Sequence, residues 1–143
     1  MIVLDTTVLV YAVGAEHPLR APCRQVVTAV REHHLEATTT VEVLQEFTHV
    51  RARRRGSDDA AALAAEFADL LSPLLIVEED DFRAGLAIYR QSTRLGAFDA
   101  VLAAVALAAG ARALVSADAG FADVRTLRHV IPDVRAVEQL EKL

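Results

Sequence analysis

Short apolar runs alternate with longer segments whose apolar positions recur every three or four residues. The short runs predict strands at Ile2–Leu4, Leu35–Thr38, Leu74–Val77 and Ala113–Val115, with a weaker one at His129–Ile131. The longer segments predict helices at Thr7–Val13, Val41–Arg54, Asp59–Leu71, Asp80–Arg94, Phe98–Ala109 and Val137–Lys142. One more helix, the second along the chain, is predicted to begin near Pro18 and Pro22 and to end at about His33. This alternation predicts an α/β fold, a single domain over residues 1–143 with a central parallel sheet of about 4–5 strands flanked by helices on both faces.

Several helix ends have recognisable signals. Gly56 and Gly110 follow the third and sixth predicted helices, as expected of residues that end a helix. Ser57 and Asp58 are expected to cap the start of the fourth helix. Pro73 lies just beyond its end, which fits a stop at about Leu71.

The composition argues against disulfide-bonded, membrane-spanning and secreted proteins. A single cysteine, Cys23, allows no internal disulfide and no cysteine-built metal site, which fits a reducing cytoplasm. No apolar run reaches the roughly 18 residues that a membrane span needs, so we expect no membrane association. Asp5 interrupts the apolar N-terminal stretch, and no basic residue precedes it, so that stretch does not read as a signal peptide.

The charge distribution excludes further chemistry. The net charge of −5 argues against binding nucleic acid through bulk electrostatics alone. Lys142 is the one lysine, and it lies next to the C-terminus. A phosphate-binding loop or a Schiff base, each of which needs a lysine in the body of the chain, is therefore disfavoured.

Three aspartates fall at positions that can meet in space. Asp5 follows the first predicted strand, Asp118 follows the fourth, and Asp99 begins an almost wholly apolar helix. Active sites of open parallel sheets form beyond the carboxyl ends of the strands, so we expect these carboxylates to lie close together. Each also has a local interpretation: Asp5 as a helix cap, Asp99 as a helix cap or a partner of the helix dipole, and Asp118 as part of an Asx-turn.

The third predicted helix offers a fourth acid, Glu42 or Glu46. At about 100° per residue, its apolar stripe is centred near Val43 and Phe47. Glu46 lies about 90° from that centre and Glu42 about 130° away, so Glu46 is the better inward-facing candidate. A solvated glutamate at the rim of the stripe remains the alternative for Glu46.

Clustered carboxylates without histidine or cysteine partners are hard oxygen ligands that suit Mg²⁺ or Mn²⁺. Such a cluster would activate water and neutralise charge on a phosphodiester. The hydroxyls of Thr6, Thr7 and Ser116 could orient the carboxylates or bound water, although bonding within local turns is an equal possibility for each.

Four segments, IVLDTTVLVYA, VLQEF, FDAVLAAVAL and LVSAD, resemble in order and spacing the PIN-domain ribonucleases, specifically the VapC toxins of VapBC toxin–antitoxin systems. The resemblance covers essentially the whole chain. It implies an acidic Mg²⁺ or Mn²⁺ pocket, hydrolysis of single-stranded or loop RNA, a cognate VapB antitoxin that occupies the active-site groove, and a homodimer.

The resemblance also implies roles for individual residues. Asp5, Glu46, Asp99 and Asp118 match the four acids of the family as catalytic and metal-binding residues, and Ser116 matches its small hydroxyl position. Thr7 departs from the pattern, because the family commonly has asparagine there. A threonine can donate one hydrogen bond but presents no amide, so we expect its support of Asp5 to differ from that in the family. Asp123 lies beyond the motif and reads as a surface or helix-start residue.

The run RARRR contributes Arg51, Arg53, Arg54 and Arg55, which could hold RNA phosphates just past the third helix. The alternative is a solvated helix end favoured by the C-terminal dipole.

Two other functions stay open. One is a phosphohydrolase with Asp5 as nucleophile, which the missing second acid at Thr7 and the missing lysine disfavour. The other is a degenerate domain that only binds a partner.

Overall fold

The computed structural model describes all residues, 1–143. Its centre is a four-stranded, wholly parallel sheet in the order β2-β1-β3-β4. The strands are β1 (Ile2–Leu4), β2 (Ala37–Thr38), β3 (Leu114–Val115) and β4 (His129–Val130). The predicted α/β class and parallel sheet are therefore confirmed.

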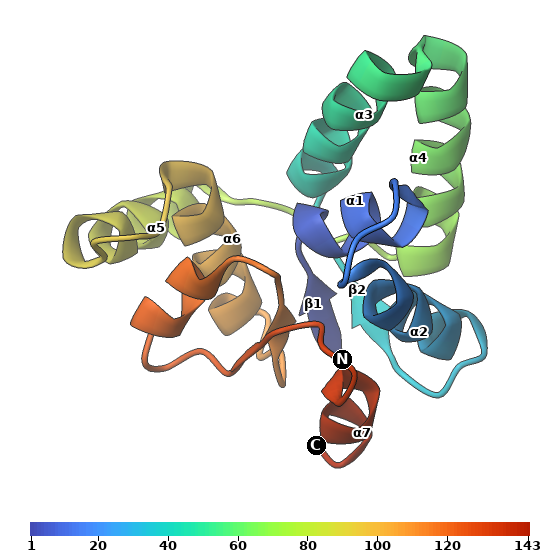
Figure 1. Cartoon of the computed structure of the whole chain (residues 1–143). Helices are drawn as coiled ribbons and strands as arrows, with labels where there is room; N and C mark the ends of the chain where they lie inside the picture. Colours follow the sequence, from blue (N-terminus) through green and yellow to red (C-terminus); the bar gives the residue numbers. More distant parts are fainter.

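Seven α-helices and one short 3₁₀ helix surround the sheet. They are α1 (Thr6–Val13), α2 (Arg20–Arg31), α3 (Val41–Arg55), α4 (Ser57–Leu71), α5 (Glu79–Gln91), α6 (Ala97–Ala108), η1 (Ala119–Asp123) and α7 (Ala136–Glu141). Figure 1 shows α5 and α6 as a pair on one side of β1, with α1 to α4 on the other side. None of these helices is both long and apolar enough to cross a membrane.

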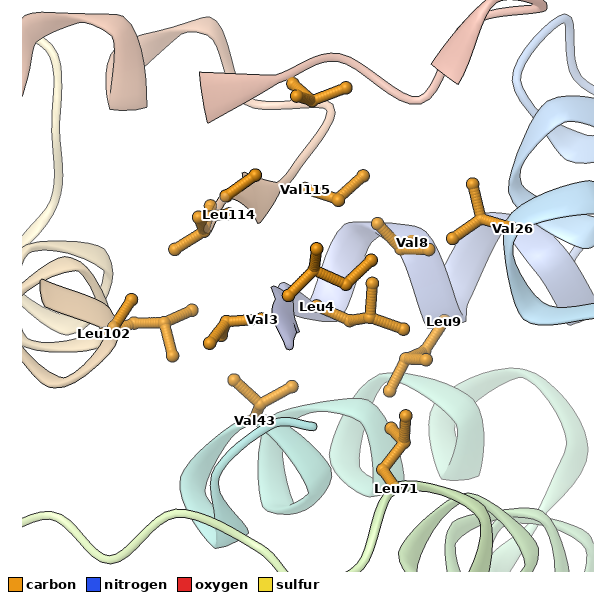
Figure 2. Close-up of a cluster of buried hydrophobic side chains, with 14 of the residues drawn as sticks. Val3, Leu4, Val8, Leu9, Val26, Val43, Leu71, Leu102, Leu114 and Val115 are labelled. Carbon is orange, nitrogen blue, oxygen red and sulfur yellow. The ribbon is translucent and has the colours of Figure 1, made fainter. Parts of the chain in front are cut away.

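The strand β1 is the middle of the core, and all three of its residues are fully buried. Figure 2 shows Val3 on the side of Val43 and Leu102, whereas Leu4 lies toward Leu9 of α1. A strand that is apolar on both faces needs helices on both faces, because each face must be removed from water. The chain therefore leaves β1 at a fixed point deep inside the molecule.

The predicted strand Leu74–Val77 is wrong. Only one isolated parallel bridge forms there, between Thr40 and Leu75. The side chain of Ile76 in this segment is 75% exposed, so the apolar run is not covered by helices as a central strand would be. The sheet accordingly has four strands, the lower end of the predicted range.

Two predicted helix boundaries also need correction. The helix α5 ends at Gln91 rather than Arg94, because the Ser92 hydroxyl accepts hydrogen bonds from the N–H groups of Arg94 and Leu95. The helix α4 already includes Ser57, and its N-cap is Gly56 with no side-chain cap bond. The predicted caps at Ser57 and Asp58 are therefore wrong.

Candidate acidic site at the carboxyl edge of the sheet

Asp5 leaves β1 at its carboxyl end and is only 3% exposed. Its backbone N–H donates to the carbonyl of Val115, 3.0 Å away, which continues the pairing with β3. One carboxylate oxygen, Oδ2, accepts from the hydroxyls of Thr7 at 2.8 Å and Ser116 at 2.6 Å. It also accepts a longer bond of 3.4 Å from the Thr7 N–H, so Asp5 caps α1 as well as lying in the candidate site.

The hydroxyls of Thr7 and Ser116 link the ends of two strands. Thr7 Oγ1 accepts from the N–H of Ala117 at 3.0 Å, and Ser116 Oγ accepts from the N–H of Asp118 at 3.0 Å. Each hydroxyl thus donates to Asp5 and accepts from the segment after β3. A threonine can do both at the position where asparagine was expected, because a hydroxyl is both donor and acceptor.

Glu46 reaches the same region from α3. Thr6 Oγ1 donates to Glu46 Oε2 at 2.8 Å, which joins the first turn of α1 to the middle of α3. Glu46 lies at the exposed rim of α3 and lines one hollow with the three aspartates, whereas Glu42 does not line that hollow. Both glutamates are exposed, and Glu42 lines an adjoining hollow with Asp5 and Asp99, so the choice of Glu46 as the inward-facing glutamate stays a prediction.

Asp99 is half-buried in the first turn of α6. The N-cap of α6 is Gly96 and Asp99 makes no capping bond, so its interpretation as an N-cap is wrong, whereas its place in the first turn agrees with the alternative of a partner of the helix dipole. Burial raises the pKa of its carboxyl to about 7, with further contributions from the charges of Asp5, Asp118 and Glu46 and from a hydrogen bond with Asp118. A carboxyl that is repelled by three others indicates a site that attracts positive charge.

Asp118 caps the short helix η1, and its Oδ1 accepts from the N–H of Gly120 at 2.7 Å. The Asx-turn expected from the sequence is therefore present as well. Asp118 also lines the hollow with the other acids, so its local and its proposed roles occur together.

The hollow that contains the four acids has a volume of about 340 Å³. Arg54 and Tyr11 also line it. Tyr11 was not predicted, although it lies one helical turn after Thr7, and the i, i+4 spacing on α1 could have indicated it. Tyr11 stacks on His17, with ring centroids 4.3 Å apart.

The four predicted arginines do not behave alike. Arg51 pairs with Asp59 and donates to the carbonyl of Val13 at 2.9 Å, so its guanidinium joins α3 to α4 and α1. Arg53 and Arg55 are exposed and do not line the acidic hollow. Only Arg54 of this set lines it.

The donor set fits a hard divalent ion. Four carboxylates lie together, and none of them forms an ion pair with a lysine, arginine or histidine. Oxygen-only donor sets of this kind suit Mg²⁺ or Mn²⁺. No three of these acids come close enough in this structure to hold one metal ion between them.

A fifth acid, Asp123, lies outside this hollow and holds the loop before α6. Its carboxylate accepts from Arg94 Nη2 at 2.7 Å and from Ser92 Oγ at 2.9 Å. The hydrogen bonds from Arg94 and then Ser92 lower the pKa of Asp123 to about 2. Asp123 therefore fixes the chain that leads to Asp99, a role that its sequence position did not indicate.

These features define an α/β protein with a carboxylate site suited to a divalent metal at the carboxyl edge of a parallel sheet. A family model described as PIN domain matches residues 2–127. Ribonuclease VapC7 of Mycobacterium tuberculosis (strain ATCC 25618 / H37Rv) is 54% identical over an alignment of 144 residues, which covers 98% of this chain and 97% of the relative. Ribonuclease VapC23 of Mycobacterium tuberculosis (strain CDC 1551 / Oshkosh) is 33% identical over 101 residues, 69% of this chain and 78% of the relative. The chain belongs to the PIN-domain family, among its VapC-type ribonucleases, which confirms the predicted resemblance.

Proposed function

We propose that this chain is a Mg²⁺- or Mn²⁺-dependent endoribonuclease that hydrolyses phosphodiester bonds of unpaired RNA. The observation that carries the proposal is the group of four acids in one hollow, where burial and the other carboxylates raise the pKa of Asp99 to about 7. Such a group suits the recognition of a phosphate through a divalent ion rather than directly. The ribonucleases VapC7 and VapC23 support the same activity.

Asp5 and Asp99 would be the principal metal ligands, and Glu46 and Asp118 would complete the site or hold coordinated water. A bound divalent ion lowers the pKa of water and neutralises charge on the phosphodiester. The chain's own contribution is orientation. Thr7 and Ser116 hold Asp5 through one carboxylate oxygen and leave the other without a protein partner.

Arg54 would hold a phosphate of the substrate, because it is the cation that shares the hollow with the acids. The guanidinium of Arg51 is already satisfied by Asp59 and the carbonyl of Val13, so we assign it a structural role. Arg53 and Arg55 would contribute general attraction for RNA from the exposed end of α3.

The proposal includes a partner and a cellular setting. As a VapC-type protein the chain would act in the cytoplasm as the toxin of a type II toxin–antitoxin system, inhibited by a VapB-like antitoxin, and would form a homodimer. The buried Cys23, whose thiol pKa burial raises to about 12, fits a protein that does not depend on disulfides.

A phosphohydrolase with Asp5 as nucleophile is less well supported. No lysine lines the acidic hollow, and Thr7 rather than a second acid stands two residues after Asp5. A domain that only binds a partner would have no need to keep four mutually repelling acids together.

The test is cleavage of a single-stranded RNA by the purified chain with Mg²⁺, Mn²⁺ or EDTA. We expect cleavage with either metal, none with EDTA, and a loss of at least about 100-fold in Asp5→Asn, the scale expected when a group that acts in the transition state is removed. Asp69→Asn, an exposed change on α4, is the matched control and should retain full activity. Full activity of a folded Asp5→Asn variant, or no cleavage by the wild type with any metal, would refute the proposal.

A further inference from the structure

A second hollow, of about 280 Å³, adjoins the acidic one on the side away from Arg54. It shares Asp5, Glu46 and Asp99 with the acidic hollow. Its remaining walls are mostly apolar and are formed by Thr40, Glu42, Val43, Val77, Phe82, Ala97, Phe98, Val101 and Leu102. The three shared acids therefore lie between a hollow with an arginine and a hollow with aromatic side chains.

Two phenylalanines of the second hollow are left open to solvent. Phe98 is 85% exposed and Phe82 is 50% exposed. Phe98 immediately precedes Asp99 in the first turn of α6, and Phe82 comes from α5, which packs beside α6 (Figure 1). A phenylalanine so exposed gains little for folding, whereas a flat ring beside a site for a phosphodiester can stack on a base.

We propose that the second hollow binds one unpaired nucleobase of the RNA, next to the bond that is cut, with Phe98 and Phe82 as its stacking surfaces. This inference rests on the proposed ribonuclease activity. The volume admits one base, and the shared acids require that the base belongs to a nucleotide beside the reacting phosphate. A base must leave its stack to enter, so the hollow selects unpaired RNA.

Glu42 gives this hollow a preference among bases. Apart from the three shared acids, it is the one charged side chain that lines the hollow. An ionised carboxylate only accepts hydrogen bonds, so it favours the exocyclic amino groups of adenine, cytosine and guanine over uracil, whose single donor, N3–H, lies between two carbonyl oxygens that a carboxylate repels. Thr40 does not compete for this role, because it is buried and its hydroxyl accepts from the N–H of Val43.

The binding test separates this subsite from catalysis. In an Asp5→Asn background, which removes cleavage, the affinity for a fluorescent RNA pentamer is measured by anisotropy in the presence of Mg²⁺. Adding Phe98→Ala should weaken binding of the unpaired pentamer about tenfold, the value of one stacked base, and should leave binding of duplex RNA unchanged. Tyr89→Ala, an exposed aromatic of α5 outside the hollow, is the matched control and should change neither affinity.

The specificity test uses otherwise active protein. Glu42→Gln should let uracil compete at the cleavage position, reducing discrimination against it about threefold to tenfold, because a glutamine amide can donate as well as accept. An unchanged base preference would overturn the assignment of Glu42.

Equal affinity of Phe98→Ala and its parent for the unpaired pentamer would overturn the subsite, even if the wild type cleaves RNA. Dissociation of a dimer by Phe98→Ala, measured by sedimentation, would also overturn it, since the hollow would then be covered by a second copy of the chain. Failure of the proposed function itself would look different, because the wild type would then cleave no RNA with either metal.

Discussion

Replacing Asp99 with asparagine should make the metal-free protein more stable above neutral pH. Folding brings Asp99 beside Asp5, Asp118 and Glu46 and partly buries it, and these effects raise its pKa from 3.8 to about 7. The folded protein therefore binds a proton at this site more tightly than the unfolded chain does. Stability from this group is highest near pH 4 and falls as the pH rises toward about 7.

The size of the effect follows from the same shift. Each pKa unit corresponds to about 1.4 kcal/mol, so a fully buried group would lose about 4 kcal/mol between those pH values. Asp99 is only half-buried, and solvent screening reduces the expected loss to about 1–2 kcal/mol. Asparagine has nearly the same shape as the protonated carboxyl, and its amide can still donate to Asp118.

Urea unfolding in EDTA at about pH 4, 6 and 8 measures the difference directly. Asp99→Asn should match the wild type near pH 4 and exceed it by about 1–2 kcal/mol near pH 8. Adding Mn²⁺ at pH 8 should reverse the order, because the wild type gains binding free energy that the variant lacks. Asp69→Asn controls for the loss of one charge. The reasoning would be refuted if the difference in free energy of unfolding between Asp99→Asn and the wild type did not grow with pH, or if the variant were less stable than the wild type at pH 8 in EDTA.

Two further predictions concern side chains around the acids. Arg51→Ala should lower the melting temperature by a few degrees, because the hydrogen bond to the partly buried carbonyl of Val13 is worth about 1–2 kcal/mol. Arg54→Ala should leave the melting temperature unchanged and raise KM for RNA. Thermal scans and cleavage kinetics of both variants check this, and the opposite assignment of losses would contradict it. Thr7→Ala should reduce kcat, because Asp5 loses a hydrogen bond. Thr7→Asn should restore most of the lost kcat, as steady-state kinetics at saturating metal would show. An equal loss of kcat in both variants would mean that only a hydroxyl fits at this position.

The positions of the acids could be predicted because simple rules fix them. Asp5 and Asp118 follow strands whose carboxyl ends meet at one edge of a parallel sheet, and the helical period favours Glu46 over Glu42. Asp99 could be placed only at the start of a helix. Its closeness to the other acids depends on how α5 and α6 pack, which no local pattern of the sequence specifies.

The interactions that distinguish similar side chains could not be predicted. Arg51 and Arg54 lie about 60° apart on α3, too close for the position of the apolar stripe to distinguish their roles. Only the packing of α3 against α4 brings Asp59 to Arg51 and not to Arg54.

The run Leu74–Val77 looked like a strand because composition alone does not show whether helices will cover both faces. In the folded chain Ile76 faces solvent and the run makes one bridge.

The contrast between Asp99 and Asp123 indicates where the site responds to pH. Asp99 lies in the first turn of α6 and Asp123 is the last residue of η1. Hydrogen bonds from Arg94 and Ser92 lower the pKa of Asp123 to about 2, whereas burial and the neighbouring acids raise the pKa of Asp99 to about 7. The Asp123–Arg94 pair therefore stays charged across the pH range in which Asp99 ionises. A shift of the pH around neutrality therefore changes the charge of the acidic hollow without releasing the loop that holds Asp99. A loss of metal affinity on acidification would then arise from protonation of Asp99, in a site whose backbone is unchanged.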